Sequence, residues 1–232
     1  RAELATAAVI AVLALFSALW RLTVADWKTD EAWDGRLAWD AIHGDWAQEN
    51  GHPVFVRWFL GLGQLVFGQD RLGIRITPAL ASLAAVWLLY LVGARLQSRW
   101  AGLLAAGLWA VLPRALVLGH TVVGPLRGDR FGYLEPFMVV ALLGATATAW
   151  RWIERGRFAD ALAAGALLGL AAAFKPTAVV VLVPIVSVAA WRRGSLRPVL
   201  APAAAMAGLA VGVFVVTYLP VGTQAPDHIV EL

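Results

Sequence analysis

Residues 161–191 read ALAAGALLGLAAAFKPTAVVVLVPIVSVAAW, and this stretch decides what kind of protein the chain is. It is apolar almost throughout and is longer than the ~20 residues that a helix needs to cross a bilayer. Lys175 and Pro176 interrupt it, and the interior of a membrane helix tolerates a charge or a proline only at a cost. The stretch therefore predicts two membrane helices that run out and back, with Lys175 at the tip of the hairpin.

Further apolar runs lie outward from this hairpin, and most are long enough to span a membrane. We expect spans at residues 4–22, 74–96, 100–112, 133–150 and 199–218. Residues 53–67 are also apolar, but this run is short and contains Arg57, so we expect a helix that lies at the membrane surface. The sequence thus predicts an all-α polytopic membrane protein with about seven crossings and extracytoplasmic juxtamembrane helices.

The composition supports this fold class and excludes several kinds of site. Hydrophobic residues make up 60% of the 232 residues and charged residues 15%, whereas soluble domains have ~45–50% and ~25%. The chain has no cysteine, so disulfides and thiolate metal sites are excluded. Its arginines stand singly or in pairs between apolar runs, so the net charge of +4 does not indicate nucleic-acid binding.

The distribution of arginines predicts the topology, because cytoplasmic loops are enriched in positive charge. Three short turns are rich in arginine: they contain Arg95 and Arg99; Arg151, Arg155 and Arg157; and Arg192, Arg193 and Arg197. If these turns and the N-terminus are cytoplasmic, the opposite face receives residues 23–72, residues 113–132, Lys175 and residues 219–232. Nearly all acidic residues also fall on that face, so we expect the chemistry to take place there, in the loop 23–72 above all.

The acidic pair Asp30-Glu31 follows the first span and is the first candidate site. A carboxylate at this place could act as a general base that takes a proton from an attacking hydroxyl. The alternative is a solvated acidic loop without a catalytic role. Glu135 stands at the outer mouth of the span 133–150, where a carboxylate is costly and tends to be functional. Its alternative role is an ion pair with Arg127 or Arg130 that fixes the loop.

A set of basic residues on the same face could bind a phosphate. It comprises His52, Arg57, Arg127, Arg130 and Lys175. His52 precedes a proline that opens a helix, and a helix N-terminus attracts anions. The ammonium group of Lys175 suits a lipid phosphate, although a lysine can also extend to the interface without a ligand. No cluster of His, Asp and Glu has the spacing of a metal site, but Asp30, Glu31 and Glu135 could recruit a divalent cation if they converge.

Four motifs occur in a fixed order. They are the Asp-Glu pair after the first span, His52-Pro53, Arg130-x-x-x-x-Glu135-Pro-Phe, and Gly169-Leu-Ala-x-x-x-Lys175. The chain in this respect resembles the GT-C glycosyltransferases, in the branch of the protein O-mannosyltransferases (dolichyl-phosphate-mannose-protein mannosyltransferase-like) and lipid A aminoarabinose transferases. Residues 1–232 match the N-terminal transmembrane module of those enzymes, so we expect a piece of a longer protein.

The resemblance implies an inverting transferase of the bacterial plasma membrane, embedded among membrane lipids. Its donor would be a polyprenyl-phosphate sugar, and its acceptor a glycan, lipid or protein. By this resemblance Asp30 is the general base and Glu31 its neighbour in the motif, His52 matches the juxtamembrane motif, and Lys175 contacts the lipid phosphate. Glu135 stands where the family usually has an aspartate.

Two other functions fit the same features. A transporter or flippase of a lipid-linked sugar would share the outer basic residues and the broken apolar stretch 161–191. Transporters often contain internal repeats, and the sequence shows none. A non-catalytic assembly subunit could keep the fold without the reaction.

Overall fold

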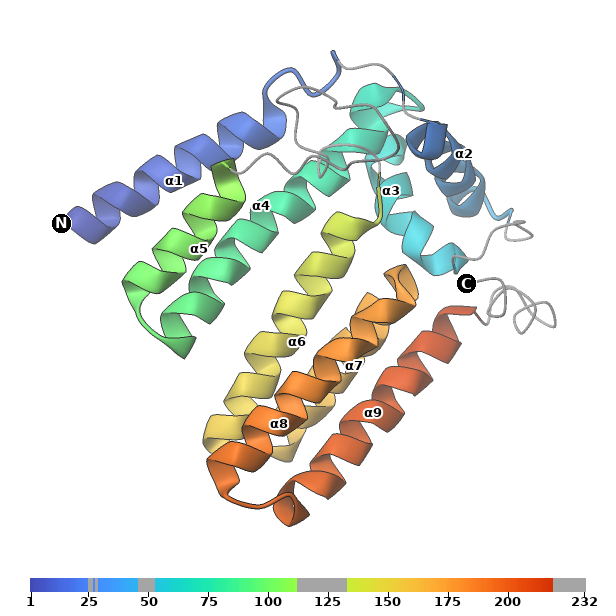
Figure 1. The fold of residues 1–232 in the computed structure, drawn as a ribbon. Coiled ribbons are helices and arrows are strands. Elements are labelled where there is room, and N and C mark those ends of the chain that lie inside the picture. Colours follow the sequence, from blue (N-terminus) through green and yellow to red (C-terminus); the bar gives the residue numbers. More distant parts are fainter. Residues whose placement is uncertain (25–26, 28, 46–52, 112–132, 219–232) are drawn as a thin grey trace. The chain divides into compact units, whose positions relative to one another are not determined.

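The structure is a computed structural model that describes residues 1–24, 27, 29–45, 53–111 and 133–218. Its regular elements in these ranges are all helices (Figure 1). In order they are α1 (Ala2–Leu19), α2 (Thr29–Ile42), α3 (Val54–Phe67), α4 (Arg71–Leu96), α5 (Arg99–Val111), α6 (Glu135–Arg155), α7 (Phe158–Phe174), the 3-10 helix η2 (Pro176–Val181), α8 (Leu182–Arg193) and α9 (Arg197–Tyr218). The prediction of an all-α membrane protein is confirmed.

Five helical segments in the described residues are long and apolar enough to cross a membrane: α1, α4, α6, η2 with α8, and α9. Helices α5 and α7 are apolar but have only 13 and 17 residues. They occupy two of the places where the sequence predicted crossings. Helix α3 has 14 residues, as expected for the short run 53–67.

Several boundaries differ from the expected spans. Helix α1 ends at Leu19 rather than Leu22, because the chain turns at Trp20–Val24. Helix α6 begins at Glu135 and continues past Trp150 to Arg155. The indole Nε1 of Trp150 donates to Glu154 Oε1 over 2.7 Å in this extra turn. Hydropathy marks where the membrane ends, whereas the hydrogen-bonded helix continues into polar sequence.

The chain divides into two compact units, which are described separately. The first comprises Arg1–Trp46 and Arg57–Phe137. In it α4 and α5 form a hairpin, and α1 packs against both (Figure 1). Ala18 and Leu22 bury their side chains against Ala79 of α4. The hydroxyl of Ser17 donates to the carbonyl oxygen of Ala110 over 2.9 Å, which ties α1 to α5.

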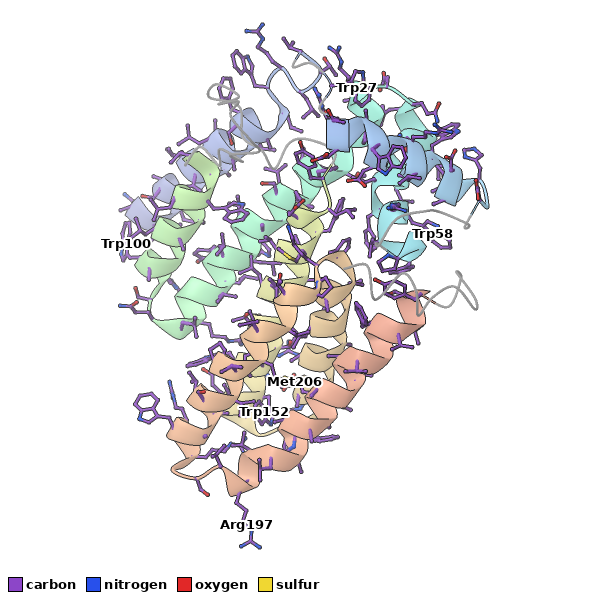
Figure 2. All side chains as sticks on the ribbon, turned by 45° about the vertical axis from the view of Figure 1, so that its right-hand side comes forward. Trp27, Trp58, Trp100, Trp152, Arg197 and Met206 are labelled. Atoms are coloured by element: carbon purple, nitrogen blue, oxygen red, sulfur yellow. The ribbon has the colours of Figure 1, made fainter. Side chains whose placement is uncertain are left out.

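The second unit comprises Ala47–Val56 and Met138–Leu232, and contains most of α6 with α7, η2, α8 and α9. Its core includes Trp152 and Met206, which lie among the helices in Figure 2, whereas Arg197 points away from them. Helices α7 and α9 approach closely because Gly165 and Gly169 have no side chain. A Cβ at Gly169 would overlap the backbone of Ala210. Small residues are typical of contacts between membrane helices.

Candidate active site

Helix α2 carries the acidic motif on the surface of the first unit. It has Asp30 and Glu31 in its first turn, where negative side chains are favoured by the unpaired N–H groups of the helix. Asp30 is exposed to solvent and Glu31 is fully buried. Adjacent residues of a helix point in different directions. The two carboxylates of the motif therefore meet different surroundings.

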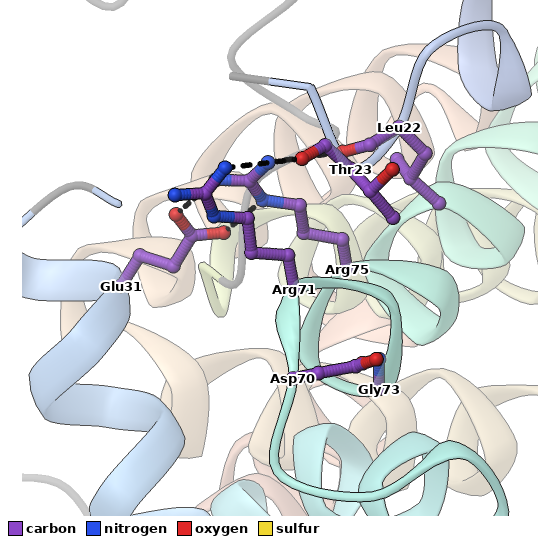
Figure 3. A network of polar contacts seen from close by, with 7 residues as sticks. All are labelled: Leu22, Thr23, Glu31, Asp70, Arg71, Gly73 and Arg75. Atoms are coloured by element: carbon purple, nitrogen blue, oxygen red, sulfur yellow. Dashed lines mark hydrogen bonds and ion pairs between the residues drawn. The ribbon is translucent and has the colours of Figure 1, made fainter. Parts of the chain in front are cut away.

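Glu31 forms a buried ion pair with Arg75 of α4 (Figure 3). Arg75 Nε donates to Glu31 Oε1 over 2.6 Å, and its Nη2 donates to Oε2 over 2.7 Å. Arg75 Nη1 also donates to the carbonyl oxygen of Leu22 over 2.9 Å. Arg75 thus connects three parts of the unit: its own helix α4, helix α2, and the turn that follows α1. This network fixes the start of α2, and with it the position of Asp30.

Asp34 lies one turn after Asp30 on the same face of α2, and its environment is unusual. The pKa of Asp34 is raised from 3.8 to about 6. Burial is the main cause, the charges of Glu135 and Asp30 add to it, and the charge of Arg57 acts against it. Arg57 comes from α3 and has no solvent-exposed surface. Glu135 is the first residue of α6. Three carboxylates and one buried guanidinium therefore lie within electrostatic range of one another.

Tyr133 borders the same group of charges just before α6. Burial, together with the negative charges of Asp30, Glu31, Glu135 and Asp34, raises the pKa of its hydroxyl from 10.0 to about 12. The hydroxyl therefore keeps its proton at neutral pH. The rings of Phe59 and Phe137 lie 5.5 Å apart and hold the start of α6 against α3.

Helix α3 is joined to α2 by a further buried contact. The side-chain Nε2 of Gln64 donates to the carbonyl oxygen of Gly35 over 3.0 Å. A cavity of about 410 Å³ adjoins this contact. It is lined by Trp27, Ala32, Gly35, Arg36, Gln64 and Gln69. Ala32, Gly35 and Arg36 occupy the face of α2 that is turned away from Asp30 and Asp34, so the cavity is separate from the acidic group.

Lys175 belongs to the second unit and ends α7. Its backbone is extended, with φ −157° and ψ 113°, and Pro176 then starts η2. The predicted break at Lys175-Pro176 is confirmed, and the side chain is exposed. An apolar groove of about 310 Å³ begins at the adjoining Pro176 and continues between α7 and α9, with Leu168, Ala210 and Phe214 in its wall.

Three of the predicted phosphate-binding residues, His52, Arg127 and Arg130, lie outside the described residues. Among the others, Arg57 is buried beside Asp34. The carboxylates Asp30 and Glu135 belong to one group of charges, whereas Glu31 is held in an ion pair. In the part of the chain that the structure describes, no three His, Asp or Glu side chains are arranged to hold a metal ion.

Sequence reasoning missed Asp34, Arg75 and Tyr133. Two of them had a signal. Asp34 follows Asp30 by four residues, which places both on one face of a helix. Arg75 stands at the start of an apolar run, where a charge needs a partner. The position of Tyr133 depends on tertiary packing and has no comparable signal.

Helices that span a membrane and a group of carboxylates beside buried arginines define a polytopic membrane protein with an acidic surface site. The family model for "Dolichyl-phosphate-mannose-protein mannosyltransferase" matches residues 51–219. The chain belongs to this family of GT-C glycosyltransferases.

Two curated relatives have similar sequences. One is an undecaprenyl phosphate-alpha-4-amino-4-deoxy-L-arabinose arabinosyl transferase of Pseudomonas aeruginosa, with 28% identity over 56% of this chain and 31% of that protein. The other is the corresponding transferase 1 of Pseudomonas fluorescens, with 31% identity over 30% of this chain and 14% of that protein. The matched region therefore spans about a third of the relatives' length or less. No solved structure matches the chain significantly.

Proposed function

We propose that the protein transfers a sugar from a polyprenyl-phosphate donor to a hydroxyl group of an acceptor glycan, lipid or protein. The observation that carries the proposal is the group formed by Asp30, Asp34, Glu135 and Arg57 on the surface of a chain of this family. The names of the relatives, which specify an undecaprenyl-phosphate aminoarabinose, support a lipid-linked donor.

Asp30 is the proposed general base. Its carboxylate takes the proton of the acceptor hydroxyl while the oxygen attacks the anomeric carbon. The bond between that carbon and the phosphate oxygen breaks on the opposite side, so the configuration inverts and the lipid phosphate leaves with the bonding electrons. Orientation of the two substrates and stabilisation of the departing charge would lower the barrier by several kcal/mol.

The remaining residues have supporting roles in this proposal. Glu31 holds α2 through Arg75, so that Asp30 keeps its place. Arg57 and Glu135 set the charge around the acidic group. Lys175 binds the lipid phosphate, and the apolar groove that starts at Pro176 lies next to it in the same unit. His52, Arg127 and Arg130 assist at the phosphate in this proposal, because they are basic residues that the sequence predicts on the same face.

We place this site on the extracytoplasmic face of a bacterial plasma membrane. The argument is the distribution of arginines along single helices. Helix α7 starts beside Arg157 and ends at Lys175, and its 17 residues separate these two ends by about 25 Å. Helix α4 likewise has Arg75 near its start and Arg95 in its last turn. The turns rich in arginine belong on the cytoplasmic side by the positive-inside rule.

A transfer assay on the purified full-length protein tests the proposal. It uses a panel of radiolabelled polyprenyl-phosphate sugars with Asp30→Asn in parallel. Asp40→Asn is the matched control, because Asp40 is on the same helix and pairs with Arg36 over 3.8 Å at the surface. We expect transfer from one donor, loss in Asp30→Asn and retention in Asp40→Asn. Full turnover in Asp30→Asn would refute the role of the base.

Two further arms separate the alternatives. If the donor binds but no sugar is transferred or released, a flippase assay in vesicles distinguishes a transporter from an assembly subunit. A chelator arm tests for a divalent cation: loss of turnover in EDTA that Mg²⁺ or Mn²⁺ restores would show that the carboxylates act together with a metal.

A further inference from the structure

Asp34 is a carboxylate for which the mechanism above has no use. It lies four residues after Asp30 on α2, a spacing that brings two Cβ atoms to about 6 Å from each other. Asp30 is exposed to solvent, whereas Asp34 is half-buried. The two carboxylates are therefore neighbours, and Asp30 is the more exposed of the two.

The charges around Asp34 act in opposite directions. From α2 itself Asp30 faces it, from α3 Arg57, and from the start of α6 Glu135. Burial and the two carboxylates favour the neutral form of Asp34, while the guanidinium of Arg57 favours the ionised form. The neighbouring pair of Glu31 and Arg75 adds no net charge. Burial and the two carboxylates outweigh Arg57 and raise the pKa of Asp34 to about 6, so both protonation states are accessible in weakly acidic solution.

We propose that Asp34 is a second proton acceptor, which receives from Asp30 the proton that Asp30 takes from the acceptor hydroxyl. This inference rests on the proposed transfer reaction. The proton leaves the hydroxyl as its oxygen bonds to the anomeric carbon, binds Asp30, and then moves to Asp34 directly or through one water. Asp30 is ionised again, and Asp34 becomes neutral. After the product leaves, Asp34 releases the proton to solvent.

The relay has an electrostatic advantage. The relay leaves the net charge of the group unchanged, but it restores the ionised form of Asp30 and moves the neutral carboxyl group to Asp34, where burial favours it. Arg57 is fully buried, and its positive charge favours the ionised form of Asp34, so it promotes release of the proton afterwards. A single solvated aspartate would lack a neighbouring carboxylate that accepts the proton. It would also lack a cation that favours the later release of this proton. Asp34 acts through Asp30 and does not need to touch the substrate.

The pH dependence of transfer under single-turnover conditions tests the relay. The variants are Asp34→Asn, Asp34→Glu and, as a control on the same helix, Asp40→Asn. A relay needs ionised Asp34, so the wild-type rate should fall as the pH drops through about 6. Asp34→Asn should lose at least about tenfold in rate at pH 7.5 and lack this fall, with an unchanged KM for the donor. Asp34→Glu should restore both, and Asp40→Asn should behave as the wild type.

A second readout does not need activity. Infrared difference spectra recorded between pH 7.5 and 5 should show the carbonyl band of a protonated carboxylic acid in the wild type and in Asp40→Asn. This band should be absent from Asp34→Asn. If Asp34→Asn keeps the band, another group titrates there and the proposal is wrong.

The outcomes distinguish the two proposals from each other. If the wild type transfers sugar and Asp34→Asn keeps both the rate and the fall near pH 6, the relay is wrong and the proposed function stands. If the wild type transfers sugar from no donor in the panel, the proposed function fails and the relay fails with it, whatever the infrared band does.

Discussion

Arg75 holds Glu31 by two hydrogen bonds of 2.6 and 2.7 Å, and both side chains are almost completely removed from solvent. The two residues come from different helices, α4 and α2, and the bonds are parallel and charge-assisted. Removing one partner would leave the other as an unpaired buried charge. This pair therefore yields the first prediction, which concerns stability rather than turnover.

Glu31→Gln or Arg75→Met should each lower the free energy of unfolding by about 3–5 kcal/mol, because a single charge stays buried. Thermal unfolding in detergent measures the change. The control is Glu3→Gln, since Glu3 pairs with Arg99 over 3.3 Å while the two side chains are 41% and 71% exposed. Such a surface pair contributes about 0–1 kcal/mol. Equal melting temperatures of Glu31→Gln and Glu3→Gln would contradict the structural role of the buried pair.

The contact between α7 and α9 gives a second prediction. Gly169→Ala should destabilise the protein by about 1–3 kcal/mol, because the added methyl group overlaps the backbone of Ala210 and forces the helices apart. Gly212→Ala on α9 is the matched control, since a Cβ there would meet no atom within 4 Å. It should leave the melting temperature unchanged or raise it, because alanine favours a helix. Similar melting temperatures of the two variants would show that the close contact is absent.

The surroundings of Asp34 predict how stability depends on pH. Its pKa is raised from 3.8 to about 6 in the folded protein, so between these values the folded state binds more protons than the unfolded state. The contribution of Asp34 to stability is therefore greatest in acid and is lost as the pH rises from about 4 to about 6. As the pH rises across this range, the melting temperature should fall less steeply in Asp34→Asn than in the wild type. Asp40→Asn should keep the wild-type slope, and an equal slope in all three proteins would refute the raised pKa.

Lys175 is predicted to bind the donor through its phosphate. Lys175→Ala should weaken binding of a polyprenyl-phosphate sugar by about 10- to 100-fold, because one charge-assisted hydrogen bond is lost. Lys175→Arg should retain most of the affinity. Arg197→Gln removes an exposed positive charge from the start of α9 and should have no effect. Donor affinity that stays unchanged in Lys175→Ala would show that the phosphate binds elsewhere.

The elements that the sequence predicted well are those with a local signal. Lys175-Pro176 breaks an apolar run, and α7 ends there. The short run 53–67 forms a short helix, because length and hydrophobicity are properties of the segment itself. After Pro176 the chain continues as a 3-10 helix before α8, which the sequence could not predict. This continuation depends on the extended backbone conformation of Lys175 at the end of α7.

The sequence indicated which segments carry the charged residues of the candidate site, but not how these residues are arranged. A carboxylate-rich start of α2 was evident from the sequence, and Glu135 does share the surroundings of Asp30. The sequence did not separate the roles of Asp30 and Glu31, because one residue of rotation along a helix decides which of them meets Arg75. It also treated Arg57 as a surface cation, whereas packing of α2 on α3 removes it from water.

The pair of Glu31 and Arg75 also constrains the order in which the chain can assemble. The two residues are 44 positions apart, so Glu31 is synthesised before its partner. Until Arg75 arrives with the next long helix, the carboxylate has to remain in water, and α2 cannot settle against the rest of the protein. The segment that bears Asp30 would thus reach its final place only after α4 is inserted. The acidic group around Asp30 would then be completed only late in the insertion of the chain into the membrane.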